Sequence, residues 1–324
     1  MSAGPITKRL NVSVIGAGVV GAAIAYFLAK RGVAVTVFDK GRPGAGATGH
    51  SFAWINATAK HPVSYHDFNR RSVGLWDRFA KELDVDVGLR WGGQMEWAST
   101  DEGAVELESK ARQLQTWGYP CQLIDADRMA QLETGLSPRR VTAAIHCELD
   151  GMVEPASAAE ACIRAAAKHG AAVKLETEVT GLTIKSGSNT VSAVVAGRET
   201  LDVDVVVLAG GVDTTQLAAM AGLTVPQQDS PGVVIRTSPI AQPIFSNISV
   251  LYAPPPEPGR SEIHLRQCLD GSVMIGEGTQ HSLANDDSQG HADELLARAA
   301  EYVPALNGTA AIPVPVGYRP GRFD

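Results

Sequence analysis

Residues 12–39 read VSVIGAGVVGAAIAYFLAKRGVAVTVFD, a strand, a glycine turn, a helix and a second strand in that order. The apolar run at residues 12–15 and the β-branched run at residues 33–38 predict two buried strands. Between them, residues 19–28 predict a helix that opens directly after the turn. Because Asp39 closes the second strand, this order predicts a Rossmann-like unit that holds an ADP-containing cofactor.

The glycines of this turn predict a site for a pyrophosphate. Gly16 permits the tight turn, Gly18 lets the backbone approach the phosphates, and Gly21 lets the helix pack closely. The N–H groups at the start of the helix receive the negative charge, and Asp39 accepts hydrogen bonds from a ribose. The predicted cofactor-binding residues of this segment are Gly16, Gly18, Val19, Val20, Gly21, Asp39 and Lys40. Both NAD and FAD fit this pattern, and a glycine-rich turn without a ligand is the structural alternative.

The composition is that of a soluble enzyme with two domains. The chain has 324 residues, of which 44% are hydrophobic, so it can bury one large core or two smaller ones. A formal net charge of −7 gives no electrostatic footprint for nucleic acid. The four cysteines have neither CxxC nor zinc spacing, which indicates reduced thiols in a cytoplasmic protein and no metal site. We expect no membrane span, because the N-terminus lacks a signal peptide and residues 19–28 are too few to cross a bilayer.

The apolar pattern changes along the chain in a way that predicts two interleaved domains. Residues 66–83 predict one amphipathic helix, and residues 89–98 predict a strand. The continuously apolar residues 205–208 predict a strand that is buried on both faces of a layered sheet. After residue 233, short strands separated by Pro-rich or Asp-Gly turns predict an antiparallel sheet. Further helices are predicted at residues 101–117, 126–132, 156–169 and 214–221, and further strands at residues 141–146, 172–179, 182–186 and 190–196.

Five blocks of the chain resemble the D-amino-acid oxidase family of FAD-dependent oxidoreductases, which includes glycine oxidase and sarcosine oxidase. Besides the opening segment they are GAGAT at residues 44–48, DGMVEP at 150–155, VVVLAGG at 205–211 and VGYRP at 316–320, in family order. The resemblance implies a mixed α/β fold in which a Rossmann-like FAD-binding domain is interleaved with an antiparallel-sheet substrate domain. It implies an FAD-binding domain at residues 1–85, 147–228 and 314–324, and a substrate domain at residues 86–146 and 229–313.

The resemblance also extends the cofactor site to other segments. The residues concerned are Gly46, Ala47, Thr48, Ser51, Val179, Ala209 and Gly210. Thr48 and Ser51 would line the ribityl chain and flavin, with helix capping as the alternative for both. The backbone of Val179 would face the adenine. Gly210 would lie under the cofactor because a side chain there would collide with it.

Four residues are predicted on the substrate side. Arg319, in the Gly-x-Arg-Pro segment, would clamp the substrate carboxylate with a two-pronged ion pair. Arg266 and His264 lie on one predicted strand, and one of them is expected to face the flavin, with a structural role as the alternative for each. His50 has three alternatives: covalent attachment to the flavin, a noncovalent contact in the active site, or a structural role.

The function implied by the resemblance is oxidation of the C–N bond of a D-amino acid, glycine or an N-methyl amino acid. Hydride would pass from Cα or the N-methyl group to flavin N5, and water would hydrolyse the resulting imine. The sarcosine oxidases that this chain resembles place a lysine over the flavin to help oxygen react, and no lysine follows Lys185 here. The resemblance therefore favours a redox partner over oxygen as the electron acceptor. Two alternatives remain: a non-catalytic or partner-dependent flavin-binding subunit of a heteromeric amine dehydrogenase, and an NAD-dependent dehydrogenase.

The C-terminal end departs from the family pattern. In that family a further stretch follows the Gly-x-Arg-Pro segment, whereas this chain stops at Asp324. We therefore expect an incomplete flavin pocket, either because the chain is truncated or because a partner chain or an oligomer supplies the missing wall.

Overall fold

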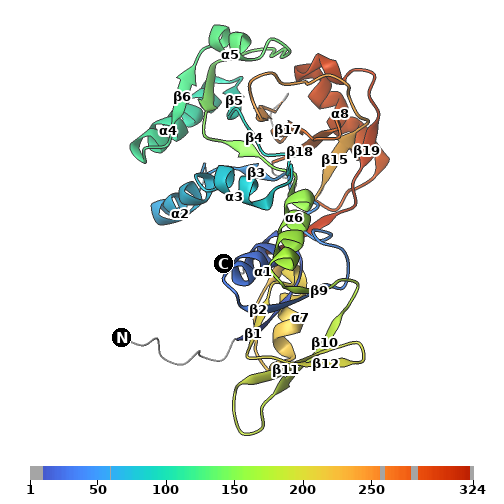
Figure 1. The fold of residues 1–324 in the computed structure, drawn as a ribbon. Coiled ribbons are helices and arrows are strands. Elements are labelled where there is room, and N and C mark those ends of the chain that lie inside the picture. The colour runs from blue at the N-terminus through green and yellow to red at the C-terminus, as the bar shows by residue number, and fades with distance from the viewer. Residues whose placement is uncertain (1–9, 59, 256–259, 279–283, 322–324) are drawn as a thin grey trace. The chain divides into compact units, whose positions relative to one another are not determined.

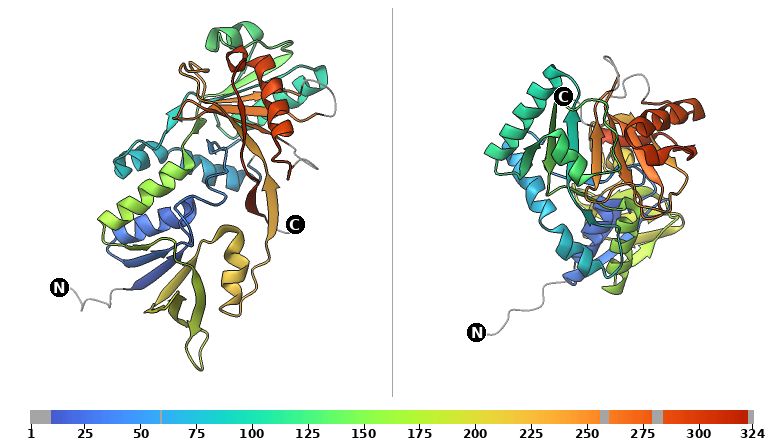
Figure 2. Two further views of the ribbon diagram at one scale, coloured as in Figure 1. Left: turned by 90° about the vertical axis from the view of Figure 1, so that its right-hand side faces the viewer. Right: turned by 90° about the horizontal axis from the view of Figure 1, so that it is seen from above.

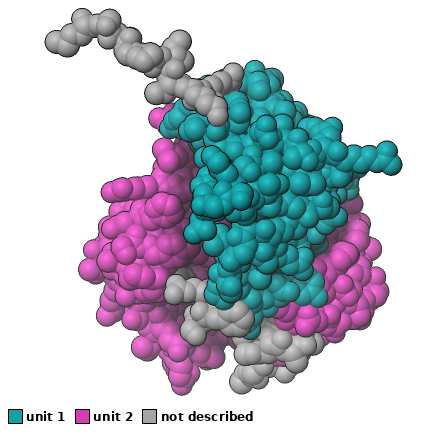
Figure 3. All heavy atoms as spheres, turned by 90° about the horizontal axis from the view of Figure 1, so that it is seen from below, with its two compact units in different colours: residues 1–51, 155–230, 317–324 teal, residues 52–154, 231–316 magenta. Residues whose placement is uncertain are grey.

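The computed structural model describes residues 10–58, 60–255, 260–278 and 284–321. Two compact units divide the chain (Figure 3). Unit 1 comprises Met1–Ser51, Pro155–Ser230 and Gly317–Asp324, and unit 2 comprises Phe52–Glu154 and Pro231–Val316. Each unit is therefore assembled from separate segments of the chain.

The borders of these units differ from those of the predicted domains in two main places. Residues 52–85 and 147–154 belong to unit 2, whereas we predicted them in the FAD-binding domain. Strand pairing gives the reason, because β8 (Gly151–Met152) lies between β3 (Trp54–Ile55) and β4 (Arg90–Trp91) in a three-stranded sheet. The assignment of one unit to the cofactor and the other to the substrate stays a prediction.

Unit 1 is built on a parallel four-stranded sheet in the order β13-β1-β2-β9. Its strands are β1 (Asn11–Ile15), β2 (Ala34–Phe38), β9 (Ala172–Lys174) and β13 (Val205–Leu208). The helices α1 (Val19–Lys30) and α6 (Pro155–Lys168) lie side by side (Figures 1 and 2). Alanines form much of the buried surface of both helices, which lets their backbones approach closely. The Rossmann-like order predicted for residues 12–39 is confirmed.

The strand β13 corrects one prediction. It lies at the edge of the sheet, and Val205 is 41% exposed, so β13 is not buried on both faces. In the described part of the chain it pairs within this sheet only with β1. Its apolar run therefore reflects β propensity and partial burial rather than a central position.

The rest of unit 1 consists of small elements around this sheet. An antiparallel sheet contains β10 (Val179–Ile184), β11 (Val191–Ala196) and β12 (Glu199–Asp202). The predicted strand over residues 172–179 is wrong, because β9 ends at Lys174 and β10 begins at Val179. The helix α7 (Thr214–Ala219) follows a 3-10 turn (Gly211–Asp213). The strand β20 (Gly317–Gly321) pairs with β14 (Gln228–Gly232). The last two residues of β14 are assigned to unit 2.

Unit 2 is built on an eight-stranded sheet in the order β19-β15-β18-β17-β16-β5-β7-β6. The strands are β5 (Gln94–Ala98), β6 (Cys121–Ile124), β7 (Ala143–Cys147), β15 (Val234–Thr237), β16 (Val250–Ala253), β17 (Ile263–Gln267), β18 (Val273–Glu277) and β19 (Ala311–Pro313). All neighbours pair antiparallel except β16 and β5, which pair in parallel. The predicted antiparallel sheet is confirmed, and residues 86–146 add three strands to it.

The two faces of this sheet differ because side chains alternate along each strand. One face packs Leu251, Leu265 and Ile275 into the core with α8 (Gln289–Tyr302), a helix that we did not predict. The register pairs Tyr252 with His264 and His264 with Gly276. The opposite face, which we call the polar face, carries Gln94, Glu96, Tyr252, His264 and Arg266.

Two further predictions fail at glycines. The single helix over residues 66–83 is instead α2 (Val63–Val73) and α3 (Trp76–Leu83), interrupted at Gly74. The strand over residues 89–98 is interrupted at Gly92 and Gly93, whose φ angles of 143° and 87° favour glycine. The helices α4 (Asp101–Thr116) and α5 (Ala126–Leu132) are confirmed.

The described residues include no helix long and apolar enough to span a membrane. Cys121, Cys147, Cys162 and Cys268 are all free and buried, as the reduced-thiol prediction requires.

Candidate cofactor and substrate sites

The glycine turn after β1 is held by backbone packing inside unit 1. Gly16 has a φ of +109°, and a Cβ on it would lie 2.2 Å from the carbonyl oxygen of Ala209. A Cβ on Gly21 would lie 2.0 Å from the carbonyl oxygen of Gly16. The tight turn and the close helix packing predicted for these glycines are both present. The end of β1 thus meets the end of β13, where Ala209 donates its N–H to Ile15 O at 2.8 Å.

The N-terminus of α1 is capped by a residue from a distant loop. Gly18 is the N-cap and offers no side-chain hydrogen bond, but the Val19 N–H donates to Thr48 Oγ1 at 3.0 Å. The alternative role for Thr48 was capping of the segment that follows it in the chain. The structure shows that Thr48 instead caps α1, a helix that precedes it. Its hydroxyl therefore stands beside Gly18, where the helix dipole favours an anion.

The carboxylate of Asp39 lies beside the same turn. Its Oδ2 accepts the Ala17 N–H at 2.6 Å and its Oδ1 accepts the Gly41 N–H at 2.7 Å. Lys40 points elsewhere, because its Nζ pairs with Asp213 Oδ2 at 2.7 Å, and this contact raises the pKa of Lys40. Asp39 thus ties β2 to the glycine turn, whereas Lys40 ties β2 to the start of α7.

The remaining predicted cofactor residues lie in three places in unit 1. Val179 begins β10 and is buried against Ile15 and Phe38. A Cβ on Gly210 would lie 2.6 Å from Leu217 Cδ1. Packing within the protein therefore favours glycine at this position, in addition to the predicted collision of a side chain with a cofactor. In the loop after β2, the Ser51 N–H donates to Thr48 O, and Gly46, Ala47 and Ser51 are exposed or half-buried. Their cofactor contacts stay predictions.

His50 meets the Gly-x-Arg-Pro segment within unit 1. A Cβ on Gly317 would lie 2.5 Å from His50 Cβ. The His50 side chain therefore occupies the space that a side chain at residue 317 would need. His50 Nδ1 lies 3.1 Å from Gly46 O. Because residues two apart on a strand share a face, Arg319 extends from β20 on the face that meets His50. Two predicted substrate-side residues from opposite ends of the chain therefore gather at one strand, and Arg319 Nη2 lies 3.4 Å from Ser230 Oγ.

His264 is half-buried in an aromatic setting in unit 2. Its ring stacks on Tyr252 with centroids 5.1 Å apart and meets the edge of Phe52 at 4.5 Å. The ring lies over Gly276, where a Cβ would approach Nε2 to 2.5 Å. Burial lowers the pKa of His264 to about 4, so the imidazole is neutral at pH 7.

Arg266 shares the polar face with His264, because residues two apart on a strand point to the same side, and a contact of either with the flavin stays a prediction. The two are separated by one residue on β17; Arg266 is buried and His264 is half-buried. Arg266 Nη1 donates to Glu154 Oε1 at 2.9 Å, and its Cζ lies 5.8 Å from the Phe52 ring centroid. Side-chain alternation along the predicted strand would have indicated this shared face, but the sequence analysis did not draw that conclusion.

Sequence reasoning missed a buried polar group at Asp150, a residue that we named only as part of the block at residues 150–155. Its Oδ2 accepts the Trp54 Nε1–H at 2.9 Å, and its Oδ1 accepts a hydrogen bond from the Tyr119 hydroxyl. Burial raises the pKa of Asp150 to about 7. Trp54 continues the cluster to Tyr252, with ring centroids 5.2 Å apart. No local signal in the sequence links these residues, because they are far apart along the chain.

Comparisons with known proteins agree with this arrangement. The family model DAO, described as FAD dependent oxidoreductase, matches residues 11–324. An opine oxidase subunit of Rhizobium meliloti is 28% identical over 336 residues, covering 98% of this chain and 83% of that protein. Glycine oxidase of Geobacillus kaustophilus is 27% identical over 329 residues, with coverage of 98% and 83%. The crystal structure of glycine oxidase from Geobacillus kaustophilus matches with a TM-score of 0.81 at 27% identity, covering 97% of this chain and 83% of that one.

The residues of unit 1 fit the FAD that this family uses. Gly16 and Gly21 form a turn that no Cβ could enter, and the N-terminus of α1 beside it offers N–H groups and the Thr48 hydroxyl to a pyrophosphate. Asp39 lies next to this turn with a carboxylate for a ribose. FAD, rather than the NAD alternative, is therefore the cofactor. The chain belongs to the DAO family of FAD-dependent oxidoreductases.

Proposed function

We propose that this protein oxidises the C–N bond of an amino acid whose carboxylate is held by Arg319. The observation that carries the proposal is the packing of His50 on Gly317, because it joins the strand of Arg319 to the loop that caps α1. That loop contains Thr48, so a predicted carboxylate clamp and the FAD-binding segment belong to one compact unit. The names of the relatives, glycine oxidase and an opine oxidase subunit, support an amino-acid substrate.

In this proposal the residues of unit 1 orient the cofactor and the substrate. The glycine turn and the first N–H groups of α1 hold the pyrophosphate, and Asp39 holds the ribose. The guanidinium of Arg319 binds both carboxylate oxygens, which fixes the direction of the substrate Cα–H bond. FAD, when bound, supplies the acceptor for two electrons.

Catalysis in this proposal rests on placement and on a substrate amine that arrives unprotonated. Water then hydrolyses the imine product.

The name of one relative favours a second candidate function. The opine oxidase relative is named as a subunit, and so as one part of a larger assembly. This chain is then a flavin-binding subunit that depends on a partner for turnover. In either case we place the protein in the cytoplasm, because its cysteines are free and buried. Its electron acceptor in this proposal is oxygen or a redox partner.

An absorption spectrum of the purified chain tests these candidates. Glycine, sarcosine and D-amino acids are added anaerobically, and the same sample is acid-precipitated. Bleaching of a flavin band by one substrate supports the enzyme, and flavin without bleaching supports the partner-dependent subunit. Pigment retained in the pellet and lost in His50→Ala supports covalent attachment at His50. A colourless chain that FAD cannot reconstitute contradicts both candidates.

The role of Arg319 is tested by substitution. Arg319→Lys keeps the charge but loses the two-pronged geometry, and we expect kcat/KM to fall at least about 10-fold. Arg140→Lys is the control, because Arg140 is an exposed arginine that pairs with Asp101 in unit 2. Equal activity of the two variants contradicts the clamp.

A further inference from the structure

Two of the four cysteines lie directly opposite each other in the eight-stranded sheet of unit 2. The register of the antiparallel strands β6 and β7 pairs Cys121 with Cys147, and residues paired in this way point to the same face of a sheet. Both side chains are buried, in the core that α4 forms with this end of the sheet. The fold therefore brings together two thiols whose spacing along the chain did not indicate a pair.

The backbone around Cys121 and Cys147 shows that they form the closer of the two kinds of antiparallel pair. The Cys121 carbonyl accepts a hydrogen bond from Gln115 Nε2 at 2.8 Å. The Cys147 carbonyl is directed toward β5, because a Cβ on Gly93 would lie 2.6 Å from its oxygen. Carbonyls directed away from the partner strand mark a non-hydrogen-bonded pair, in which the Cα atoms are about 4.5 Å apart. A disulfide joins Cα atoms about 4.4 to 6.8 Å apart, so this pair can be bridged with little movement of either strand.

The surroundings of the pair favour one of the two sulfurs as the nucleophile. A hydrogen bond from the Cys147 thiol lowers the pKa of Cys121, and the Lys110 ammonium lowers it further. The same hydrogen bond and burial raise the pKa of Cys147. Because thiolates rather than thiols react with oxidants, Cys121 is the sulfur that reacts first and Cys147 is the thiol that follows.

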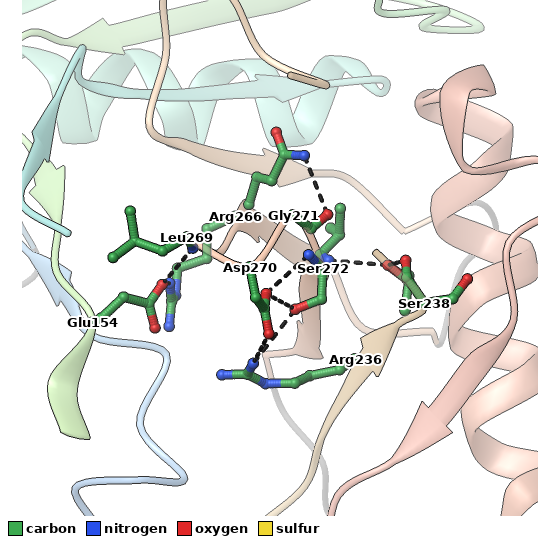
Figure 4. A network of polar contacts seen from close by, with 11 residues as sticks. Glu154, Arg236, Ser238, Arg266, Leu269, Asp270, Gly271 and Ser272 are labelled. Carbon is green, nitrogen blue, oxygen red and sulfur yellow. Dashed lines mark hydrogen bonds and ion pairs between the residues drawn. The ribbon is translucent and has the colours of Figure 1, made fainter. Parts of the chain in front are cut away.

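The other two cysteines provide a comparison. Cys268 lies just after β17 and donates its N–H to Ser272 O at 2.8 Å, in a turn where the Ser272 hydroxyl donates to Asp270 (Figure 4). Burial raises the pKa of Cys268. Cys162 lies in α6 of unit 1, and burial raises its pKa to about 12. These two thiols are as buried as the pair, but their surroundings do not favour a thiolate.

We propose that Cys121 and Cys147 form a reversible disulfide when hydrogen peroxide oxidises the protein, and that this bond fastens the edge strand β6 to β7. The Cys121 thiolate attacks one peroxide oxygen and becomes a sulfenic acid, and the other oxygen leaves as hydroxide and takes up the thiol proton as water. The Cys147 sulfur then attacks the Cys121 sulfur, and the sulfenic hydroxyl leaves with the Cys147 proton as a second water. Two electrons pass from the thiols to peroxide, and a dithiol reverses the reaction. The proposal does not depend on the proposed function.

Peroxide reaches the pair at the edge of the sheet. The strand β6 is the last in the order of eight, and Cys121 is its first residue. Gln122 and Leu123, which follow, are exposed. Local opening of such an edge costs little free energy and admits a molecule as small as peroxide. Once formed, the bond closes the chain between β6 and β7 into a loop, which restricts the unfolded state and stabilises unit 2.

Thiol counting on the full chain tests this proposal. The reduced protein is treated with hydrogen peroxide and denatured in an alkylating reagent, and its mass and its peptides are measured. We expect Cys121 and Cys147 to lose their thiols together, at least about 10-fold faster than Cys162 and Cys268. A linked peptide that contains both residues should appear, and dithiothreitol should release it. The Tm of the oxidised protein should be at least about 3 °C above that of the reduced protein.

Two variants separate the steps of the reaction. Cys147→Ser keeps the sulfur that reacts first, so peroxide should leave a sulfenic acid at Cys121 that dimedone labels, with no rise in Tm. Cys268→Ser is the matched control, because it replaces a buried cysteine of the same unit, and it should keep both the disulfide and the rise in Tm.

Three outcomes would overturn the proposal. They are a disulfide that involves Cys162 or Cys268, loss of all four thiols at one rate, and a Tm that does not rise when the pair is oxidised. Each is observed on the wild-type protein, so the decision does not require that either variant folds.

Discussion

The two candidate sites of this protein are built in opposite ways. In unit 1 the predicted cofactor site is mostly made of residues close in sequence, such as Gly16, Gly21 and Asp39, and is shaped largely by backbone packing. In unit 2 the polar face consists of side chains from strands that lie far apart in sequence, such as Gln94 and His264. The first site depends on the absence of side chains, and the second depends on the register that brings side chains together.

This difference decides how each site responds to substitution. A methyl group added to the turn of unit 1 meets backbone, which cannot move without moving β13. A methyl group added to the polar face of unit 2 meets the end of a side chain, which a second substitution can remove. Substitutions in the two units therefore distinguish backbone packing from side-chain packing.

Gly16→Ala should have the largest effect. The new Cβ would lie 2.2 Å from Ala209 O, at a residue whose φ is +109°. We expect a loss of about 3 to 5 kcal/mol in the free energy of unfolding, measured by urea denaturation, together with loss of FAD binding. Gly181→Ala in β10 is the control, because its Cβ meets Val195 only at an ordinary 3.6 Å. Similar stabilities for the two variants would mean that the turn relaxes and that backbone packing does not fix the site of unit 1.

Gly276→Ala tests the corresponding contact in unit 2. The new Cβ would lie 2.5 Å from His264 Nε2, and Phe52 and Tyr252 restrict the movement of that ring. We expect a loss of about 2 to 3 kcal/mol. In His264→Ala/Gly276→Ala the clash is absent, so a double-mutant cycle should give a coupling of about 1 to 2 kcal/mol. Additive effects would show that the two side chains do not share this space.

The same contrast explains what could be predicted from the sequence. The glycine turn of unit 1 was predictable because its function requires fixed spacings within about 30 residues. The polar face was not predicted, although the alternation within β17 would have placed His264 and Arg266 on one side. Its extension to Gln94 depends on the parallel pairing of β16 with β5, and no pattern along the chain encodes that pairing. Asp150 was missed for the same reason, since its partners Trp54 and Tyr119 come from elsewhere in the chain.

The pH dependence of the free energy of unfolding should differ in sign for two titratable groups of unit 2, Asp150 and His264. The pKa of Asp150 is raised to about 7, so the folded state binds more protons than the unfolded state and stability falls as the pH rises from about 4 to 7. The pKa of His264 is lowered to about 4, so stability rises with pH up to the unfolded value near 6.5. Between about pH 4 and the unfolded value near 6.5, the two groups therefore change the stability in opposite directions.

Asp150→Asn removes one of these two titrations. Relative to the wild type, the variant should gain about 2 kcal/mol in the free energy of unfolding between pH 5 and pH 7. Denaturation series at pH 5, 6 and 7 measure this difference, and Asp101→Asn is the control because Asp101 is exposed. A constant difference between Asp150→Asn and the wild type would contradict a raised pKa at Asp150.

Thr48→Val tests the one side chain on which the predicted phosphate site of unit 1 depends. Gly18 offers no side-chain cap, so the Thr48 hydroxyl is what accepts the Val19 N–H at the start of α1. Valine keeps the shape of threonine and removes the acceptor, so we expect a loss of about 1 kcal/mol without cofactor. Thr48→Ser keeps the hydroxyl and should stay close to the wild type. If FAD restores the stability of Thr48→Val, phosphate oxygens replace the hydroxyl as acceptor for α1. A deficit that persists with FAD bound would instead mean that Thr48 and the cofactor hold different N–H groups of the helix.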